Sequence, residues 1–560
     1  MAAGESLSRG VPDAAIFSFE VWRPQALLDP LLDPAMTERV EALPVWPAFS
    51  ASPQFRQLTD GVRFIEMAID ADWRKATREL TAGGMLFAAA PGERAVLLVA
   101  TENEERLRKL HEIAGQITRS EARKAGREDP VRAEEIDGLT RWTFNGKEAH
   151  TIVDGRLVAA SDSATLDAVL RTMKAGEAGT LAASAPYRAA CAAVGDEAVA
   201  MAYVNLRVLR SAPAVAQALA GSNENPLAAL LVAGLATGLK QADWLAVGFY
   251  VEGRALVART VLGPGSGPAD GPASVVLPPA GRAGALPNFA VPGQIAALSL
   301  FRDLHRFYAA KDELFPARTS GLIFFENMMG IFFTGRDLTD EVLARLGPEI
   351  RLVVARQDYP AAAGAPEPEL PGFALVLPLK DREFKLILEE AWQKALGLVN
   401  FTRGQKAEPG LILDRPQHRG LTMTVARFST AGLAPEDRGD TRFNFQPTLA
   451  MPADFAILSS SESLARKLVD AVQAGPATGL PLGGSHTALQ LDGGRLAEVL
   501  RANHEPMVRG NMLKEGHTRA EAELAIDTLL ALVGQVRQAS LTLQGGNGPS
   551  EASLRIEFTR

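Results

Sequence analysis

Apolar and polar residues alternate with a period of two along many short segments of the chain. This pattern is typical of strands that bury one face. In the first half it predicts strands at 15–22, 85–90, 95–101, 139–144, 148–153, 156–161, 198–206, 244–251 and 255–262. Dipeptides that favour tight turns, Pro91-Gly92, Asn145-Gly146 and Asp154-Gly155, separate several of these segments. Because a tight turn can join only antiparallel neighbours, we expect mainly antiparallel sheets.

Other segments repeat their apolar residues at helical spacing. In residues 102–118, Leu107, Leu110, Ile113 and Ile117 fall on one face of a helix. The remaining helices of the first half are expected at 24–32, 73–80 and 164–174, and in an alanine-rich region that ends near 240. The second half repeats this order of strands and helices. Its strands are expected at 295–300, 350–356, 373–379, 421–428, 455–459, 538–543 and 553–558. Its helices are expected at 304–314, 384–396 and 463–474. Strands joined by tight turns and mixed with helices predict an α+β fold, not a doubly wound nucleotide-binding fold.

The two halves also resemble each other in amino-acid sequence. Residues 11–20 (VPDAAIFSFE) match 291–300 (VPGQIAALSL), and 157–176 match 455–475, with a weaker echo between 200–206 and 487–491. Ordered self-similarity indicates repeated structural units. We therefore expect two tandem copies of one domain, at 11–262 and 289–560, joined by a Gly/Pro-rich linker at 263–288. Segments 357–371 and 431–440 are expected to be loop insertions of the second copy.

Composition narrows the class of protein. The chain has 560 residues, of which 47% are hydrophobic and 22% are charged, as in ordinary folded proteins. Its formal net charge of -8 argues against a general nucleic-acid partner, which needs excess Lys and Arg. The basic stretch 119–132 is interrupted by Glu121, Glu128 and Asp129, and we interpret it as a solvated helix face or loop.

The apolar runs are too short for a transmembrane segment. The longest candidate, 226–239, has 14 residues and contains Gly234 and Gly238, so we interpret it as a buried helix. The first residues contain no apolar core of a signal peptide. As written, the chain is expected to be cytoplasmic; an upstream signal would make it an exported protein.

Candidate chemistry is sparse. None of the seven histidines, His111, His150, His305, His418, His486, His504 and His517, lies three or four residues from another, so no local zinc pair exists. Cys191 is the single cysteine and lies among alanines, where it is expected to act as a small apolar side chain. The Gly-rich run 263–267 lacks the spacing of a phosphate loop or a nucleophile elbow. We predict no catalytic residue, no cofactor and no metal, although a site of dispersed His and carboxylates stays open.

Two short polar segments recur at matching places. Ser161, Asp162 and Ser163 precede one expected helix, and residues 459–462 (SSSE) precede its counterpart. Such residues can help to bind an anion at a helix N-terminus. More often their side chains cap the free backbone N–H groups, and we predict caps at Ser161 or Asp162 and at Ser459 or Ser460.

The order of these segments resembles internally duplicated bacterial proteins of unknown function, often exported, that are built from two long α+β halves. The resemblance rests on the entry strand at 11–19, the segment 154–166 and the strand at 202–206. It implies the same two-domain architecture. It supplies no activity and no site residue.

These observations favour a non-enzymatic binding or structural protein. An enzyme with a dispersed hydrolase-like site and a carrier of an apolar ligand are the alternatives, and a protein partner is possible in the first case. A deep pocket with convergent polar groups would favour the enzyme, and a dry apolar cavity would favour the carrier.

Overall fold

The structure is a computed structural model that describes residues 6–176, 178–212, 215, 230, 235–264, 277–278, 284–315, 319–359, 365–429, 439–475, 482, 484–545 and 551–559. The chain forms two compact units. The first contains Met1–Ala220 and Leu239–Gly267, and the second contains Gly221–Gly238 and Pro268–Arg560. Most of the expected linker lies outside the described residues. Its last part does not behave as a linker, because Ala285 is buried and its N–H donates to the Ser485 carbonyl within the second unit.

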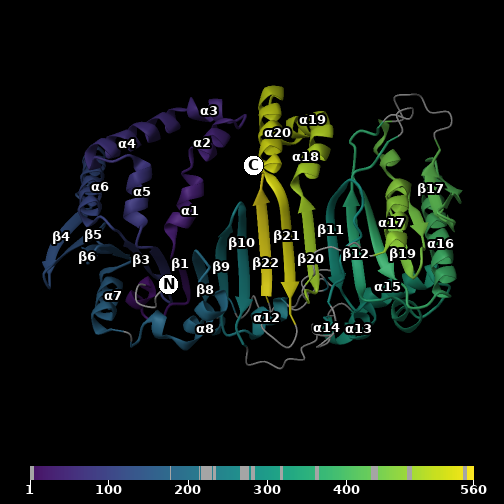
Figure 1. Cartoon of the computed structure of the whole chain (residues 1–560), viewed down its shortest axis with the longest axis horizontal. Coiled ribbons are helices and arrows are strands. Elements are labelled where there is room, and N and C mark those ends of the chain that lie inside the picture. Colours follow the sequence, from purple (N-terminus) through teal and green to yellow (C-terminus); the bar gives the residue numbers. More distant parts are fainter. Residues whose placement is uncertain are drawn as a thin grey trace. The chain divides into compact units, whose positions relative to one another are not determined.

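The first unit is built on one antiparallel sheet. Its strand order is β4-β5-β6-β7-β3-β2-β1-β8-β9-β10 (Figure 1). The strands are β1 (Phe17–Val21), β2 (Met85–Ala90), β3 (Arg94–Ala100), β4 (Val131–Ile136), β5 (Leu139–Phe144), β6 (Glu148–Val153), β7 (Arg156–Ala160), β8 (Ala200–Val204), β9 (Leu245–Glu252) and β10 (Ala255–Leu262). The turn residues predicted from the sequence take the expected conformation, with positive φ at Asn145, Gly146, Asp154 and Gly155.

Helices of the first unit lie between these strands. They are η1 (Leu7–Gly10), α1 (Pro24–Leu31), α2 (Pro34–Glu41), α3 (Trp46–Ser50), α4 (Pro53–Ile69), α5 (Trp73–Thr81), α6 (Glu104–Lys124), α7 (Ser163–Ala175), η2 (Leu181–Ala183), α8 (Ala185–Val194), α9 (Leu206–Arg210) and α12 (Leu235–Gln241). Helices α1 to α4 extend away from the strands of this unit as a chain of helices (Figure 1). Much of the expected alanine-rich helical region lies outside the described residues.

The second unit repeats the strand order of the first. Its sheet runs β14-β17-β18-β19-β13-β12-β11-β20-β21-β22, again antiparallel at every pair. The strands are β11 (Gln294–Phe301), β12 (Glu349–Ala355), β13 (Gly372–Pro378), β14 (Leu411–Asp414), β17 (Thr424–Phe428), β18 (Thr448–Ala450), β19 (Phe455–Ser459), β20 (Thr487–Asp492), β21 (Val536–Gln544) and β22 (Glu551–Phe558), beside a small pair, β15 (Gln417–His418) and β16 (Leu421–Thr422).

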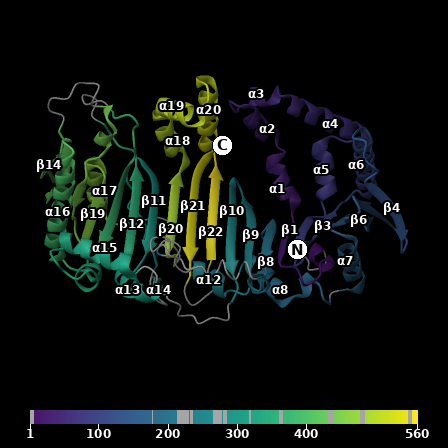
Figure 2. The same ribbon diagram turned by 180° about the vertical axis from the view of Figure 1, so that it is seen from behind.

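The helices of the second unit occupy corresponding places. They are α13 (Leu304–Ala309), α14 (Lys311–Leu314), α15 (Thr319–Phe332), η5 (Leu338–Val342), η6 (Leu343–Arg345), α16 (Phe384–Gln405), η8 (Thr441–Asn444), α17 (Glu462–Ala474), α18 (Gly493–Ala502), α19 (His504–Glu515) and α20 (Arg519–Gly534). Figure 2, the view from behind, shows α18 to α20 beyond one end of β20 and β21, as Figure 1 does. Residues 430–438, most of one expected insertion, lie outside the described part.

Matched hydrogen bonds and the strand register together fix which residues of the two units are equivalent. The Ala95 N–H donates to the Ser161 hydroxyl and the Phe373 N–H donates to the Ser460 hydroxyl, in each case the serine directly before the helix cap. Ala95 therefore corresponds to Phe373, and Leu97, which pairs with Phe87 and Ala159, corresponds to Leu375, which pairs with Leu352 and Leu458. Through the same pairs, Phe19 is structurally equivalent to Leu298. This equivalence differs by one residue from the sequence alignment of 11–20 with 291–300. Since a one-residue slip exchanges the two faces of a strand, Glu20 corresponds to the buried Ser299, not to Leu300.

Each unit has its own apolar core. In the first, Leu166 and Val169 of α7 and Tyr187 of α8 pack on one face of the sheet, against Leu86 and Leu98 among others. In the second, α17 packs through Leu464 and Leu468 on one face, while α15 and α16 pack on the other. Trp244 is buried in the first core, whereas Trp73 is 41% exposed beneath the Arg74 guanidinium.

A row of leucines crosses the second sheet. Successive pairs join Leu554, Leu541, Leu489, Leu298, Leu352, Leu375, Leu458 and Leu449 on eight neighbouring strands. The fold is thus α+β with a mainly antiparallel sheet and packed helices, as predicted from the sequence. Among the described helices, each is too short or too polar to cross a membrane.

Candidate functional site

The recurring polar segments cap helices in both units. The Asp162 carboxylate accepts from the Thr165 N–H at 2.8 Å, at the start of α7. In the second unit the Ser461 hydroxyl accepts from the Leu464 N–H at 3.4 Å, at the start of α17. The prediction is confirmed for Asp162. It is wrong by one or two residues in the second unit, where Ser461 and not Ser459 or Ser460 is the cap, because β19 extends to Ser459.

The serines before the caps have a different and equally matched role. The Ser161 hydroxyl accepts from the Ala95 N–H at 3.2 Å, and the Ser460 hydroxyl accepts from the Phe373 N–H at 2.9 Å. Both bonds join the end of a strand to the start of the neighbouring strand. Each recurring segment therefore ties a strand end and caps a helix, which explains why both units carry it without a ligand.

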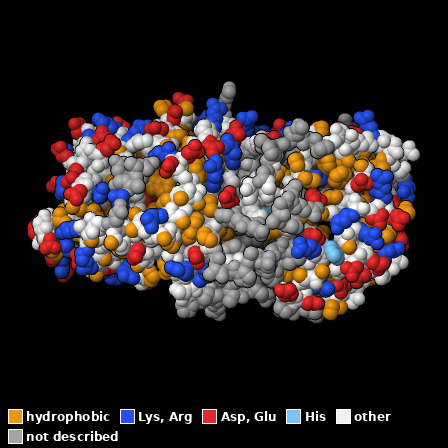
Figure 3. All heavy atoms as spheres, turned by 60° about the horizontal axis from the view of Figure 1, so that its bottom comes forward, with side chains coloured by type: hydrophobic (Ala, Val, Ile, Leu, Met, Phe, Trp, Pro, Cys, Tyr) orange, Lys and Arg blue, Asp and Glu red, His pale blue; other side chains and the backbone are white. Residues whose placement is uncertain are grey.

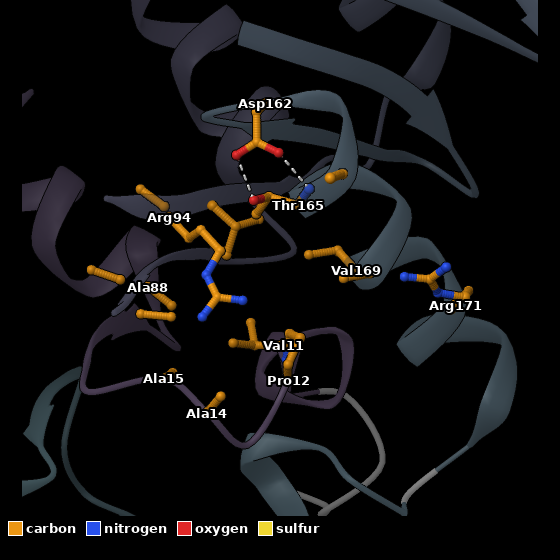
Figure 4. A pocket seen from close by; sticks show the side chains of 16 residues that line it. Val11, Pro12, Ala14, Ala15, Ala88, Arg94, Asp162, Thr165, Val169 and Arg171 are labelled. Atoms are coloured by element: carbon orange, nitrogen blue, oxygen red, sulfur yellow. Dashed lines mark hydrogen bonds between the residues drawn. The ribbon is translucent and has the colours of Figure 1, made fainter. Parts of the chain in front are cut away.

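A pocket lies beside the α7 cap of the first unit. Its volume is about 250 Å³, and its walls come from the segment before β1, from β2, from β3 and from α7 (Figure 4). Small apolar side chains dominate these walls: Val11, Ala14, Ala15, Ala88, Ala89, Ala90, Ala95, Val96, Ala164, Ala168 and Val169. We call this space the alanine pocket.

Two arginines border the alanine pocket. Figure 4 shows the Arg94 guanidinium directed between the alanines and Thr165, and Arg171 at the edge beyond Val169. The Arg94 Nε donates to the Pro91 carbonyl at 2.8 Å. No described carboxylate lies within ion-pair distance of either guanidinium, and both residues are exposed. The pocket thus combines apolar walls with two exposed, positively charged side chains.

One carboxylate also lines the alanine pocket. Asp162 receives hydrogen bonds from the Thr165 N–H, from the Thr165 hydroxyl at 2.7 Å and from the Ser161 hydroxyl at 3.0 Å. The Thr165 hydroxyl, followed by its N–H, lowers the pKa of Asp162, which stays ionised. Its charge offsets one of the two guanidinium charges, so the charged side chains that line the pocket sum to a net positive charge.

The matching place in the second unit is filled. Ala88 corresponds to Val353, Thr165 to Leu464 and Val169 to Leu468, and all three larger residues are buried in one cluster. Arg94 corresponds to Gly372, and Arg171 to Asp470, whose carboxylate accepts from His418 at 2.8 Å and from Arg419 at 3.0 Å. The pocket and both of its positive charges are therefore features of the first unit.

A second cavity of the first unit, of about 500 Å³, lies between η1 and α8. Behind it, the buried Glu20 carboxylate accepts from the Ser6 hydroxyl at 2.9 Å, from the Leu7 N–H at 2.8 Å and from the Tyr187 hydroxyl at 2.9 Å. Cys191 lines the cavity, and burial, aided by the Glu20 charge, raises the pKa of its thiol to about 12. The thiol is protonated at neutral pH and is a poor nucleophile.

The histidines are held in pairs and networks. His111 Nε2 lies 2.7 Å from His150 Nε2, beside Trp142. His418 uses Nε2 toward Asp470 and has Nδ1 at 3.1 Å from Arg466 Nη1. His486 is 3% exposed, and burial, aided by Arg302, lowers its pKa to about 4. Within the described residues, no histidine bonds to a serine or cysteine nucleophile, and no three His, Cys, Asp or Glu residues could hold a metal ion.

Sequence reasoning missed the alanine pocket, because its residues come from four separate segments. The available signal was a difference between the halves at three places: the first half has Ala88, Thr165 and Arg171 where the second has Val353, Leu464 and Asp470.

The surface provides one further apolar feature. On α15, Ile323, Phe324, Met328 and Ile331 are 49%, 70%, 37% and 68% exposed, an unusual amount for one short helix. Charged side chains of both signs are interspersed on the face drawn in Figure 3. That face has no single dominant sign among its described atoms.

Comparison with known proteins adds little to this geometry. No protein-family description matches the chain, and no curated protein matches it. Solved structures of the protein TP0453 are similar over part of the chain. Crystal form I is 10% identical, with a TM-score of 0.24, and covers 46% of this chain and 79% of its own. Crystal form III is 8% identical, with a TM-score of 0.26, and covers 49% and 85%.

Proposed function

We propose that this chain is a non-enzymatic binding protein, built by internal duplication, that holds a small ligand in the alanine pocket of its first unit. The observation that carries the proposal is the difference between equivalent places: an apolar-walled pocket with two guanidiniums that have no described carboxylate partner in the first unit, and a filled place in the second. Duplicated domains diverge where selection acts on only one copy. The identical strand order of the two units supports the duplication.

The chemistry of the described groups supports binding over catalysis. The Cys191 thiol stays protonated, the caps use Asp162 and Ser461, and both ring nitrogens of His418 are engaged. A reaction needs a nucleophile and a base within reach of each other. A panel of ester, phosphoester, peptide and glycoside substrates is therefore expected to show no turnover. Turnover that is lost on replacing His418 or His486 would contradict the proposal.

Binding is tested with a thermal-shift screen of small molecules, followed by a variant that fills the pocket. Ala88→Val combined with Thr165→Leu introduces Val and Leu, the residue types present at the equivalent places of the second unit. We expect hits of the screen to lose their effect in this variant. Hits that bind the filled variant equally well would contradict the alanine pocket as the site.

A protein partner is the second candidate. The exposed apolar stripe of α15 favours it, because such surfaces commonly mark interaction sites. Replacing Phe324 and Ile331 with Ser would weaken capture of that partner and leave the small-molecule hits unchanged.

A further inference from the structure

The alanine pocket has properties that specify the class of its ligand. This inference rests on the proposed function, and it concerns what the pocket binds. We infer that the alanine pocket takes a small organic monoanion: a carboxylate that carries a compact apolar body, of the size of a benzoate or a short branched-chain acid.

The volume sets the size of the ligand. A cavity of about 150 Å³ accepts benzene, and drug-sized molecules need about 300 Å³ or more. The alanine pocket, at about 250 Å³, lies between these limits. It therefore suits a single ring or a short branched chain with one polar group.

The walls of the pocket determine that the uncharged part of the ligand is apolar. The interior is formed by the methyl groups of alanines and by Val11, Val96 and Val169. These groups offer no hydrogen bond to a ligand, and Asp162 and Thr165, which also line the pocket, bond to each other. A sugar or a polar amino acid would therefore lose much of its hydration with little compensation. An apolar body gains from leaving water.

The two arginines set the charge. Arg94 and Arg171 both line the pocket without a described carboxylate partner, and a guanidinium binds a carboxylate with two parallel hydrogen bonds. The α7 N-terminus does not supply the anion site, because Asp162 already occupies it. A cationic ligand would face two like charges against the single Asp162 carboxylate, and a neutral ligand would gain only the weaker hydrogen bonds that a guanidinium makes to an uncharged acceptor.

The test compares a charged probe with its neutral isostere on the full chain. 4-Fluorobenzoate and 4-fluorobenzamide are titrated, and binding is followed by ¹⁹F NMR line broadening. We expect 4-fluorobenzoate to bind at least about 10-fold more tightly than the amide. Equal affinities of acid and amide would overturn the inference while leaving the proposed function intact, since both would still occupy the pocket.

Variants test whether the two arginines cause the preference for a carboxylate. Arg171→Asp and Arg94→Gly, which introduce the residue types found at the equivalent places of the second unit, are each expected to weaken 4-fluorobenzoate binding about 10-fold and to leave the amide unchanged. Arg171→Lys should retain part of the affinity. Arg188→Asp is the matched control, an exposed arginine that lines the 500 Å³ cavity instead. Loss of binding in the control alone would place the anion in that other cavity and overturn the assignment.

The filled variant, Ala88→Val with Thr165→Leu, tests whether the alanine pocket is the binding site, independently of which ligand it prefers. If it abolishes binding of both probes while its circular dichroism and melting temperature stay native, the pocket is the site. If neither probe binds the wild-type chain at millimolar concentration, and the thermal-shift screen also finds no ligand, the proposed function fails and the inference fails with it.

Acetate, which lacks the apolar body, should not compete with 4-fluorobenzoate; competition at equal concentration would contradict the role of the walls.

Discussion

At the scale of single residues, burial governs the chemistry of the groups that look reactive in the sequence. Cys191 is the clearest case, because its thiol lies near the buried Glu20 carboxylate and has a pKa of about 12. An unperturbed thiol has a pKa near 8.5, so at pH 8 the native thiolate is about 1000-fold scarcer than in the unfolded chain. We predict that Ellman's reagent modifies the native protein at least about 100-fold more slowly than the urea-unfolded protein. Replacing Glu20 with Gln should speed the native reaction, and an equally fast native reaction would contradict the prediction.

Burial also keeps the His486 side chain neutral, here by lowering the pKa of a group whose charged form is a cation. Its folded-state pKa of about 4 lies below the usual 6.5, so between these values the unfolded chain binds more protons than the native one. His150, whose pKa burial also lowers to about 4, adds to the effect. The free energy of unfolding should therefore fall as the pH drops below 6.5, by up to about 1.4 kcal/mol per pH unit for each histidine.

Urea unfolding at pH 7.5, 6.0 and 5.0 tests this pH dependence. His486→Gln should reduce the slope in that window, since the variant cannot take up the proton. The control is His517→Gln, an exposed histidine that bonds to Asn511. A slope that is the same in all three proteins would rule out His486 as a source of the pH dependence.

At the scale of elements, the period-two segments and the turn dipeptides predicted most strands within a residue or two, because both signals are local. Helix α15 was missed, since eight of its fourteen residues are large and apolar and they are not confined to one face, so the helical period is hidden. Helices α2 to α4 were also missed. Prolines 34, 47 and 53 lie in their first turns, where a missing N–H costs nothing, although the same prolines suggest loops in a sequence.

The caps allow a matched test between the two units. Asp162→Ala and Ser461→Ala each remove the acceptor of a helix N–H group and should each cost about 0.5–2 kcal/mol of stability. Ser163→Ala and Ser463→Ala are the controls, because these residues lie in the same first turns and do not cap them. Denaturant unfolding measures all four variants. Equal stability losses in caps and controls would refute the role assigned to the segments.

At the scale of the whole molecule, the two units share a strand order but have separate apolar cores. The pocket could not be predicted from either half alone, because it depends on small side chains brought together from distant segments of the first unit. Composition and motif spacing describe what is common to the two units. The alanine pocket instead depends on particular equivalent positions, Ala88, Arg94, Thr165 and Arg171, at which the first unit carries other side chains than the second.

Separate cores imply that damage to one unit stays local. Leu166 belongs to the core of the first unit and Leu468 to that of the second, and both are fully buried. Leu→Ala at such a site costs about 2–5 kcal/mol, because a cavity adds to the lost burial. By hydrogen exchange and mass spectrometry, we expect Leu166→Ala to speed exchange in β2, β3 and β7, with β12, β13 and β19 unchanged. Leu468→Ala should give the reverse pattern, because its neighbours lie in the other core. If either variant raised exchange equally in both sets of strands, the two units would unfold as one, and the first unit could not be treated as a separate binding module.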